Sequence, residues 1–408
     1  MTIRQIAFLY VFLSISSIFN YIPNMSAYNA GGTGYIATIY ATVLLLIYAG
    51  IILQIIRVYP NKNIYEVLQE VVGTLIAKVI IFLYALWAYV FMLYKVGAYS
   101  ITLQATLMPS IHPGILIVIL FLLIIYALTK NERTIFRFAE FLYQPTILFL
   151  AIIFVFALPS IQYDRLIPVN VVDLTDNLYS LPDICSIGGN LVLILFFCKK
   201  LVYSGDYKHI KKRIILTVLS FCVITILSTI LSIGINGVEL TTRLSYPMFQ
   251  AIKSVSIIHT FERFDSFLTM ICMMSDFVGV VVFLQITMLC LGWVFTRKKE
   301  TEDNNNLSGF SEKDPNSYPR KIIAAVLLFI ASVYILLRDI TQFEFETFYR
   351  NYIVYLNLAF QYIVPLLLGF LCIGKQIARN RRERKYEKYR IVPEKQGEFN
   401  DKVSIEES

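Results

Sequence analysis

Two carboxylates lie inside a stretch that is otherwise apolar enough for a lipid bilayer, residues 261–293. Small and polar residues recur along this stretch at alternating spacings of four and three: Asp265, Thr269, Cys272, Asp276 and Gly279. That period places them on one stripe of a helix. A carboxylate at mid-membrane depth costs roughly 2.5–3.5 kcal/mol unless it faces protein or water, so the stripe should face inward. It either lines a functional cavity or pairs with neighbouring helices.

A lone lysine, Lys95, lies well inside another apolar stretch, close to Tyr94 and Tyr99. An ionisable residue within a membrane span marks a functional site by default. Lys95 could serve as a proton or cation site. It could equally form a structural bridge to Asp265 or Asp276, and the sequence does not decide between these roles.

Polar or glycine residues also interrupt two apolar stretches that occupy corresponding places in the two halves of the chain. The first group comprises Ser14, Ser16, Ser17 and Asn20. The second group comprises Gly188, Gly189 and Asn190. Paired interrupted helices indicate a mid-membrane binding site, because unwound backbone offers N–H groups to a carboxylate and C=O groups to an ammonium. Alternatively, these residues have a purely structural role: the serines bond back to their own helix and the glycines permit close packing.

The composition defines the class of protein that must position these residues. Of the 408 residues 57% are apolar and only 16% are charged, whereas soluble domains carry about 25% charged residues. The apolar residues come in runs of about 20, which predicts an all-α polytopic membrane protein rather than a transmembrane barrel. The net charge of +8 lies in short loops and a tail beside the spans, so it does not indicate nucleic-acid binding.

The six cysteines are scattered without a CxxC motif, and the three histidines lie far apart. We interpret the cysteines as small packing residues and expect no metal, no cofactor and no catalytic centre. Enzymatic activity is therefore not expected.

Ten transmembrane helices are predicted, at about 5–24, 35–57, 78–107, 115–129, 138–159, 184–203, 214–235, 264–296, 322–337 and 351–374. Between the second and third, residues 61–73 carry a narrow apolar stripe. Asn63 and Glu66 indicate a helix start and Gly73 a stop, so we expect a short helix along the membrane surface. Residues 1–374 thus form a transmembrane permease-like domain, and residues 375–408 form a basic, then polar tail.

Most of the 36 lysines and arginines fall on one side of the membrane if the N-terminus is placed inside. The positive-inside rule then predicts that both termini are cytoplasmic. The basic tail either anchors this topology or also holds anionic lipid.

Short motifs in a particular order give the chain a resemblance to the B subunits of spore germinant receptors, within the amino acid–polyamine–organocation permease superfamily. The resemblance covers nearly all of residues 1–374. The motifs are Gln5, Pro23, Tyr59-Pro60, Asn63, Glu66, Gly73, Met108-Pro109, Pro113, residues 131–140, Asp164, Ile167-Pro168, Tyr246-Pro247, Ala251, Lys253 and Glu262-Arg263-Phe264-Asp265.

The resemblance implies a leucine-transporter-like fold of two inverted five-helix repeats, with broken helices 1 and 6. It also implies a nutrient-binding role in the spore inner membrane, together with an A subunit and a lipoprotein C subunit. Family members often have glycine at Ser16, an acidic residue at Asn190 and tryptophan near Cys272, and these departures leave the ligand unidentified.

Two functions follow as hypotheses. The first is a germinant-binding subunit that binds an amino acid between helices 1, 3, 6 and 8 and signals through its partners. The ligand would contact Ser14, Ser16, Ser17, Asn20, Gly188, Gly189 and Asn190, lie under Tyr94 or Tyr99, and face Thr269, Cys272, Ser275 and Asp276. The second is a proton- or cation-coupled transporter of amino acids or polyamines that uses Asp276 or Lys95.

A membrane scaffold without a ligand is the bland alternative to both. At the outer end of helix 8, Glu262, Arg263 and Asp265 are expected to form a structural or coupling clasp rather than ligand contacts.

Overall fold

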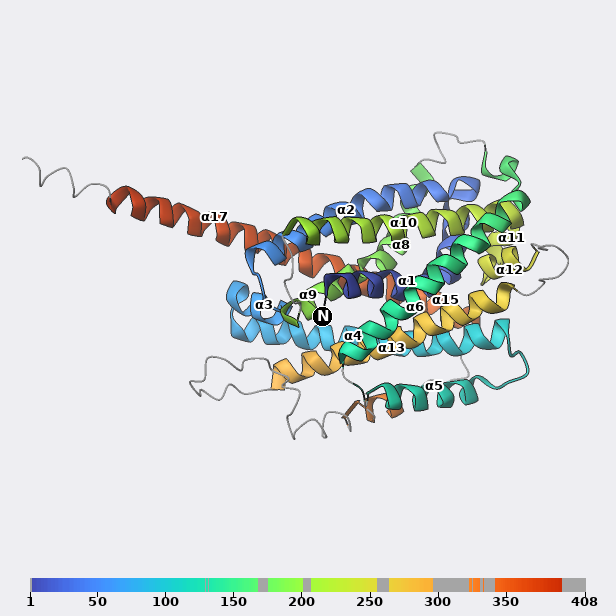
Figure 1. Ribbon diagram of the computed structural model, residues 1–408, viewed down its shortest axis with the longest axis horizontal. Coiled ribbons are helices and arrows are strands. Elements are labelled where there is room, and N and C mark those ends of the chain that lie inside the picture. Colours follow the sequence, from blue (N-terminus) through green and yellow to red (C-terminus); the bar gives the residue numbers. More distant parts are fainter. Residues whose placement is uncertain are drawn as a thin grey trace, which may run out of the picture.

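The computed structural model describes residues 2–128, 130, 132–167, 175–200, 207–254, 264–295, 323–324, 326–330, 333 and 342–390. The described part of the chain contains helices and no strand. Most of the long helices run along the long axis of an elongated bundle, and α17 extends beyond the rest at one end (Figure 1).

Seven long helices form most of the bundle: α1 (Ile3–Ala30), α2 (Tyr35–Val58), α4 (Thr74–Thr106), α6 (Glu132–Ala157), α10 (Tyr207–Asn236), α13 (Phe264–Phe295) and α17 (Val364–Arg390). Shorter helices complete it: α3 (Ile64–Val72), α5 (Pro113–Leu128), α8 (Leu181–Gly188), α9 (Leu193–Phe197), α11 (Val238–Arg243), α12 (Pro247–Ser254), α15 (Gln342–Phe348) and α16 (Val354–Leu358).

Within the described residues, eight helical segments are long and apolar enough to cross a membrane, and α5 is a shorter apolar helix. This confirms an all-α polytopic membrane protein. The structure describes only half of the predicted ninth span, 322–337, so the count of ten and the inverted repeat stay predictions. The last helix, α17, continues past the predicted span end at residue 374, to Arg390.

The first helix forms the centre of the bundle. Nearly every residue of α1 from Ile6 to Ala27 is buried, and α1 packs against α10, α13 and α6. Helices α4 and α13 lie side by side along much of their length. A polar side chain on α1, or on the faces of α4 and α13 that meet, is therefore surrounded by protein rather than lipid, as an intramembrane charge requires.

The predicted break in the first helix is wrong, because α1 is continuous from Ile3 to Ala30. Its polar residues find partners without unwinding the backbone. The Ser14 hydroxyl donates to the Tyr10 carbonyl of the preceding turn at 2.9 Å, a bond that leaves a helix intact. Ser16, Ser17 and Asn20 bond to neighbouring helices.

The short amphipathic helix between the second and third spans is confirmed as α3. Asn63 Oδ1 accepts from the Glu66 N–H at 2.9 Å, and Glu66 Oε2 accepts from the Asn63 N–H at 3.2 Å. This reciprocal pair satisfies two of the free donors at the helix start. Gly73 ends the helix with φ at +91°, a left-handed conformation that favours glycine.

Candidate functional site

A buried ion pair lies where α1, α4 and α13 meet. Lys95 Nζ of α4 lies 2.9 Å from Asp276 Oδ1 of α13, and the two side chains are only 2% and 1% exposed. Lys95 Nζ also donates to Ser17 Oγ at 3.0 Å. The Ser16 hydroxyl donates to Asp276 Oδ2 at 2.7 Å. Both carboxylate oxygens are thus bonded, and Lys95 uses two of its three donors.

The spacing of residues on α13 explains how the lysine reaches its partner. Gly279 follows Asp276 by three residues and so lies on the same helix face. A Cβ added at Gly279 would lie 3.7 Å from Cδ of Lys95, in ordinary contact with the lysine stem. The polar stripe of α13 therefore faces the ammonium of Lys95. Of the two predicted partners, the structure selects Asp276 over Asp265.

Hydrogen bonds extend from this pair along α1 to α12. Asn20 Nδ2 lies 3.4 Å from Ser16 Oγ and 3.2 Å from Thr102 Oγ1, and the Thr102 hydroxyl donates to Tyr246 OH at 3.4 Å. Burial raises the pKa of Tyr246 well above its ordinary value, so this phenol stays neutral at physiological pH. Neither Thr102 nor Tyr246 was among the predicted site residues, because neither is unusual for its stretch of sequence.

One acceptor in this network is unsatisfied. Asn20 is 1% exposed, and its Oδ1 has no hydrogen-bond partner among the described residues. A buried polar atom without a partner costs roughly 1–3 kcal/mol. The network therefore has one acceptor, Asn20 Oδ1, that a further hydrogen-bond donor could satisfy.

A hydroxyl from α13 enters the hydrogen-bond ladder of α1. Ser275 Oγ donates to the Phe12 carbonyl at 2.6 Å and accepts from the Ser16 N–H at 3.4 Å. These two backbone groups are the i and i+4 partners of one helical turn. A side chain inserted between such partners is a recognised cause of helix distortion. Helix α1 is continuous, yet the turn next to the ion pair depends on α13 for its bonds.

The predicted interruption of the sixth helix is present as a change of helix type. Between α8 and α9, residues Gly189–Val192 form a short 3-10 segment. Side chains of neighbouring helices satisfy carbonyls at the end of α8: Tyr362 OH donates to Cys185 O and Tyr10 OH donates to Gly188 O, both at 2.8 Å. Two phenols therefore stabilise the interruption by bonding the Cys185 and Gly188 carbonyls, and a ligand contact at Gly188, Gly189 or Asn190 stays a prediction.

The last helical segment is irregular where it faces this interruption. Residues Tyr349–Ile353 and Ala359–Ile363 are π-helical turns, a rare form that often marks functional sites. Gln361 Nε2 donates to Asn190 Oδ1 at 3.1 Å. Among the described residues, no hydrogen bond joins Gly188, Gly189 or Asn190 to Lys95 or Asp276. The predicted site residues thus fall into two clusters rather than one.

Aromatic rings cover the ion pair on the side of Tyr94. The Tyr94 ring stacks on Phe345 at 5.0 Å and on Tyr349 at 5.1 Å, and Tyr21 stacks on Tyr349 at 4.6 Å. A Cβ at Gly97 would lie 2.7 Å from Phe345 Cε2, so α15 packs tightly onto α4. Tyr94 and Tyr99 are both buried on α4, and the role of either one in covering a ligand stays a prediction.

The remaining predicted residues have structural contacts. Thr269 donates to the Asp265 carbonyl at 2.9 Å, and Cys272 is buried. Asp265 Oδ1 is buried without a partner among the described residues. Glu262 and Arg263 lie outside the described residues, so their clasp with Asp265 stays a prediction. Within the part of the chain that the structure describes, no cluster of His, Cys, Asp or Glu has the makings of a metal site.

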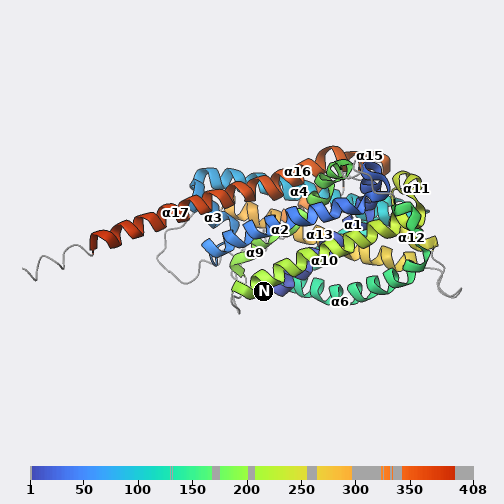
Figure 2. The ribbon, with the colours of Figure 1, turned by 90° about the horizontal axis from the view of Figure 1, so that it is seen from above.

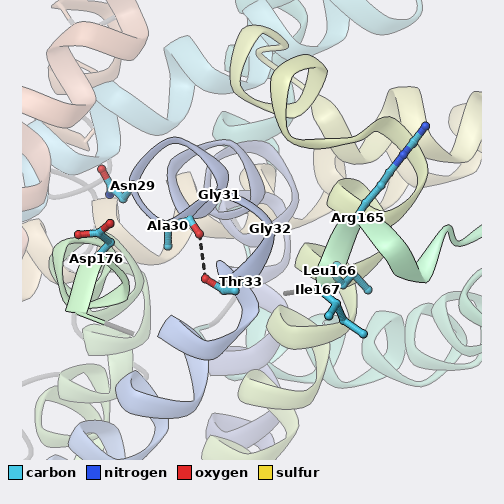
Figure 3. A pocket seen from close by; sticks show the side chains of 9 residues that line it. All are labelled: Asn29, Ala30, Gly31, Gly32, Thr33, Arg165, Leu166, Ile167 and Asp176. Carbon is cyan, nitrogen blue, oxygen red and sulfur yellow. Dashed lines mark hydrogen bonds between the residues drawn. The ribbon is translucent and has the colours of Figure 1, made fainter. Parts of the chain in front are cut away.

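A cavity of about 250 Å³ lies at the C-terminal end of α1, away from the ion pair (Figure 3). The glycine-rich turn of residues 30–34 forms one wall. The Arg165 side chain points away from that turn in Figure 3, and its guanidinium bonds the Gly234 and Ile235 carbonyls at the end of α10. This contact caps a helix.

A polytopic helical bundle with a buried charge pair and an interrupted sixth helix is the architecture of a permease-type integral membrane protein. The family model described as "Spore germination protein", of the spore permease type, matches residues 1–310. The chain belongs to this family of spore germination proteins, which confirms the predicted relationship to germinant receptor B subunits.

Two relatives from Bacillus subtilis (strain 168) support this assignment. Spore germination protein KB is 23% identical over 389 residues, which cover 93% of this chain and 96% of the relative. Spore germination protein YndE is 22% identical over 273 residues, which cover 65% of this chain and 72% of the relative.

Proposed function

We propose that this chain is the germinant-binding B subunit of a spore nutrient germination receptor, and that it binds an amino acid between α1, α4 and α13. The observation that carries the proposal is the buried pair of Lys95 and Asp276, with the unsatisfied Asn20 oxygen beside it. Family membership supports the receptor role.

The charge pair matches the two ends of an amino-acid zwitterion. An α-carboxylate would bind Lys95 Nζ and the Ser17 hydroxyl, which already lie 3.0 Å apart. An α-ammonium would bind Asp276 and donate to the free oxygen of Asn20. A zwitterion inserted here would replace one buried ion pair by two. A simple amine or acid would leave one buried charge unpaired, which is costly in a low dielectric.

Binding would act on the receptor through helix position. To admit a ligand, α13 must move relative to α1, and this motion breaks the contacts of Ser275 with Phe12 and Ser16. The ligand shifts the balance between closed and open forms only as far as its affinities for the two forms differ. In the receptor, the open form would signal to an A subunit and a lipoprotein C subunit in the spore inner membrane.

The test is the germinant dose–response of spores that carry Asp276→Asn. Loss of the carboxylate charge should raise the required germinant concentration about tenfold or more, because a charge-assisted bond contributes roughly 1.5–3 kcal/mol. Thr287→Val is a matched control on the same helix, since Thr287 bonds only its own backbone, at Phe283 O. An unchanged dose–response at normal protein level would remove Asp276 from the site.

The second candidate is a proton- or cation-coupled transporter of amino acids or polyamines. The buried Lys95–Asp276 pair favours it, because such pairs within a membrane mark proton and ion pathways. Uptake of labelled amino acids into proteoliposomes that hold only this chain separates the two functions. Concentrative uptake supports transport, whereas binding without uptake supports the receptor subunit.

A further inference from the structure

A small cavity of about 50 Å³ lies between α1, α6 and α10. Figure 2 shows the N-terminus beside the first turns of α10, with α6 next to them. The cavity is lined by Arg4, Phe8, Tyr143, Arg213, Leu216 and Ser220, among others. Leu216 is 56% exposed on the outer surface of the bundle, which is the surface that lipid covers in an integral membrane protein.

The guanidinium groups of Arg4 and Arg213 line this cavity. Each has N–H donors without a partner among the described residues. Arg4 pairs with Glu140 through Nε alone, at 3.2 Å, and the other oxygen of Glu140 accepts from Gln5 at 3.1 Å. The terminal amino groups of Arg4 have no partner among the described residues. Arg213 likewise has no carboxylate within ion-pair distance in the described part of the chain.

Stacked aromatic rings form another part of the wall. The Phe8 and Tyr143 rings stack at 4.3 Å, and the Arg4 guanidinium lies 5.1 Å above the Phe8 ring. This stacking fixes the direction of the guanidinium, which then offers its fork of N–H groups as phosphate recognition requires. Two arginines and an exposed leucine thus line the same cavity. Such a site suits an anion that carries an acyl chain.

We propose that this cavity binds the headgroup phosphate of an anionic phospholipid, with an acyl chain along Leu216. The phosphate would accept from Arg4 and Arg213. Basic pockets between transmembrane helices recognise lipid headgroups in this way. The bound lipid would hold α1, the central helix, to α6 and α10. This site is separate from the amino-acid site and does not depend on it.

The test measures lipid affinity of the purified full chain in a neutral detergent, from the rise in unfolding temperature with added lipid. Dioleoylphosphatidylglycerol should stabilise the chain more than dioleoylphosphatidylcholine does. The affinity for phosphatidylglycerol should fall about fivefold in Arg213→Gln and about thirtyfold in Arg4→Gln/Arg213→Gln. Arg213→Gln breaks no ion pair of the described residues, so its loss of affinity reports on the lipid alone.

The matched control is Lys211→Gln/Lys212→Gln, which removes two exposed charges of α10 outside the cavity. It should retain the affinity of the unaltered chain. An equal loss in this control would overturn the site, because the attraction would then be to total positive charge. Unchanged affinity in the arginine variants would also overturn it. Equal stabilisation by inorganic phosphate would overturn the assignment to lipid.

Discussion

The free energy of folding does not explain why Lys95 and Asp276 form a buried pair. Taking two charges out of water costs several kcal/mol for each ion, and their attraction repays this only when the geometry and the other hydrogen bonds are good. Here Ser16 and Ser17 supply those bonds. Apolar residues of similar size often stabilise a protein equally well. The ion pair is therefore better explained by the ligand-binding role that we propose for it.

Removing one member of the pair should destabilise the chain far more than removing both. Lys95→Met leaves Asp276 buried without its counter-charge and should cost about 3–5 kcal/mol, while Lys95→Met/Asp276→Leu should recover most of that loss. Thermal unfolding in detergent of the two single variants and the double variant measures this coupling. Additive losses in the double variant would show that the two side chains do not interact.

The sequence reveals these residues because each violates the apolar pattern of its span. Ser16, Ser17 and Asp276 were predicted as ligand contacts and Lys95 as a structural or coupling charge. The structure brings all four together. The choice of Asp276 over Asp265 depends on how far α4 and α13 are shifted along each other. That shift is set by packing between distant segments, which single-sequence periodicity does not report.

At the scale of elements, only one of the two predicted interruptions is present. In α8 and α9, the glycine pair changes the helix type, and in α1 the serines do not interrupt the helix at all. A serine hydroxyl can donate to a backbone carbonyl of its own helix and leave that helix intact. Glycines have no side chain and so allow another helix to approach. Helix boundaries and the α3 cap were predictable from local residues, but the inserted hydroxyl of Ser275 was not, because it comes from another helix.

Close packing at Gly189 predicts a specific sensitivity to substitution. A Cβ there would lie 2.1 Å from Gln361 Oε1, so Gly189→Ala should cost about 1–3 kcal/mol through forced repacking. Gly50→Ala is the matched control, because nothing lies within 4 Å of a Cβ at that helical position. The control should be neutral or stabilising by up to about 1 kcal/mol. Equal unfolding temperatures for the two variants would contradict the close contact of residues Ala359–Ile363 with residues Gly189–Val192.

At the scale of the whole molecule, the predicted topology can be tested by labelling. All six native cysteines are buried, so a single exposed cysteine would dominate the reaction with a membrane-impermeant thiol reagent. Lys208→Cys, at the start of α10, should react only from the cytoplasmic side. Gln162→Cys should react only from the outside, because the Gln162 N–H donates to Gly234 O near the opposite end of α10, at 3.1 Å. Reaction of both from the same side would contradict the topology.

The central claim is that the buried pair recognises both charges of an amino acid. The most direct measurement is the ligand-induced rise in unfolding temperature of the purified chain with each of the common amino acids. The best ligand is then compared with its decarboxylated amine and its deaminated acid. The account predicts that both analogues bind at least about tenfold more weakly than the zwitterion, and that Lys95→Met/Asp276→Leu binds none of the three. Equal binding of an analogue, or undiminished binding by the double variant, would contradict it.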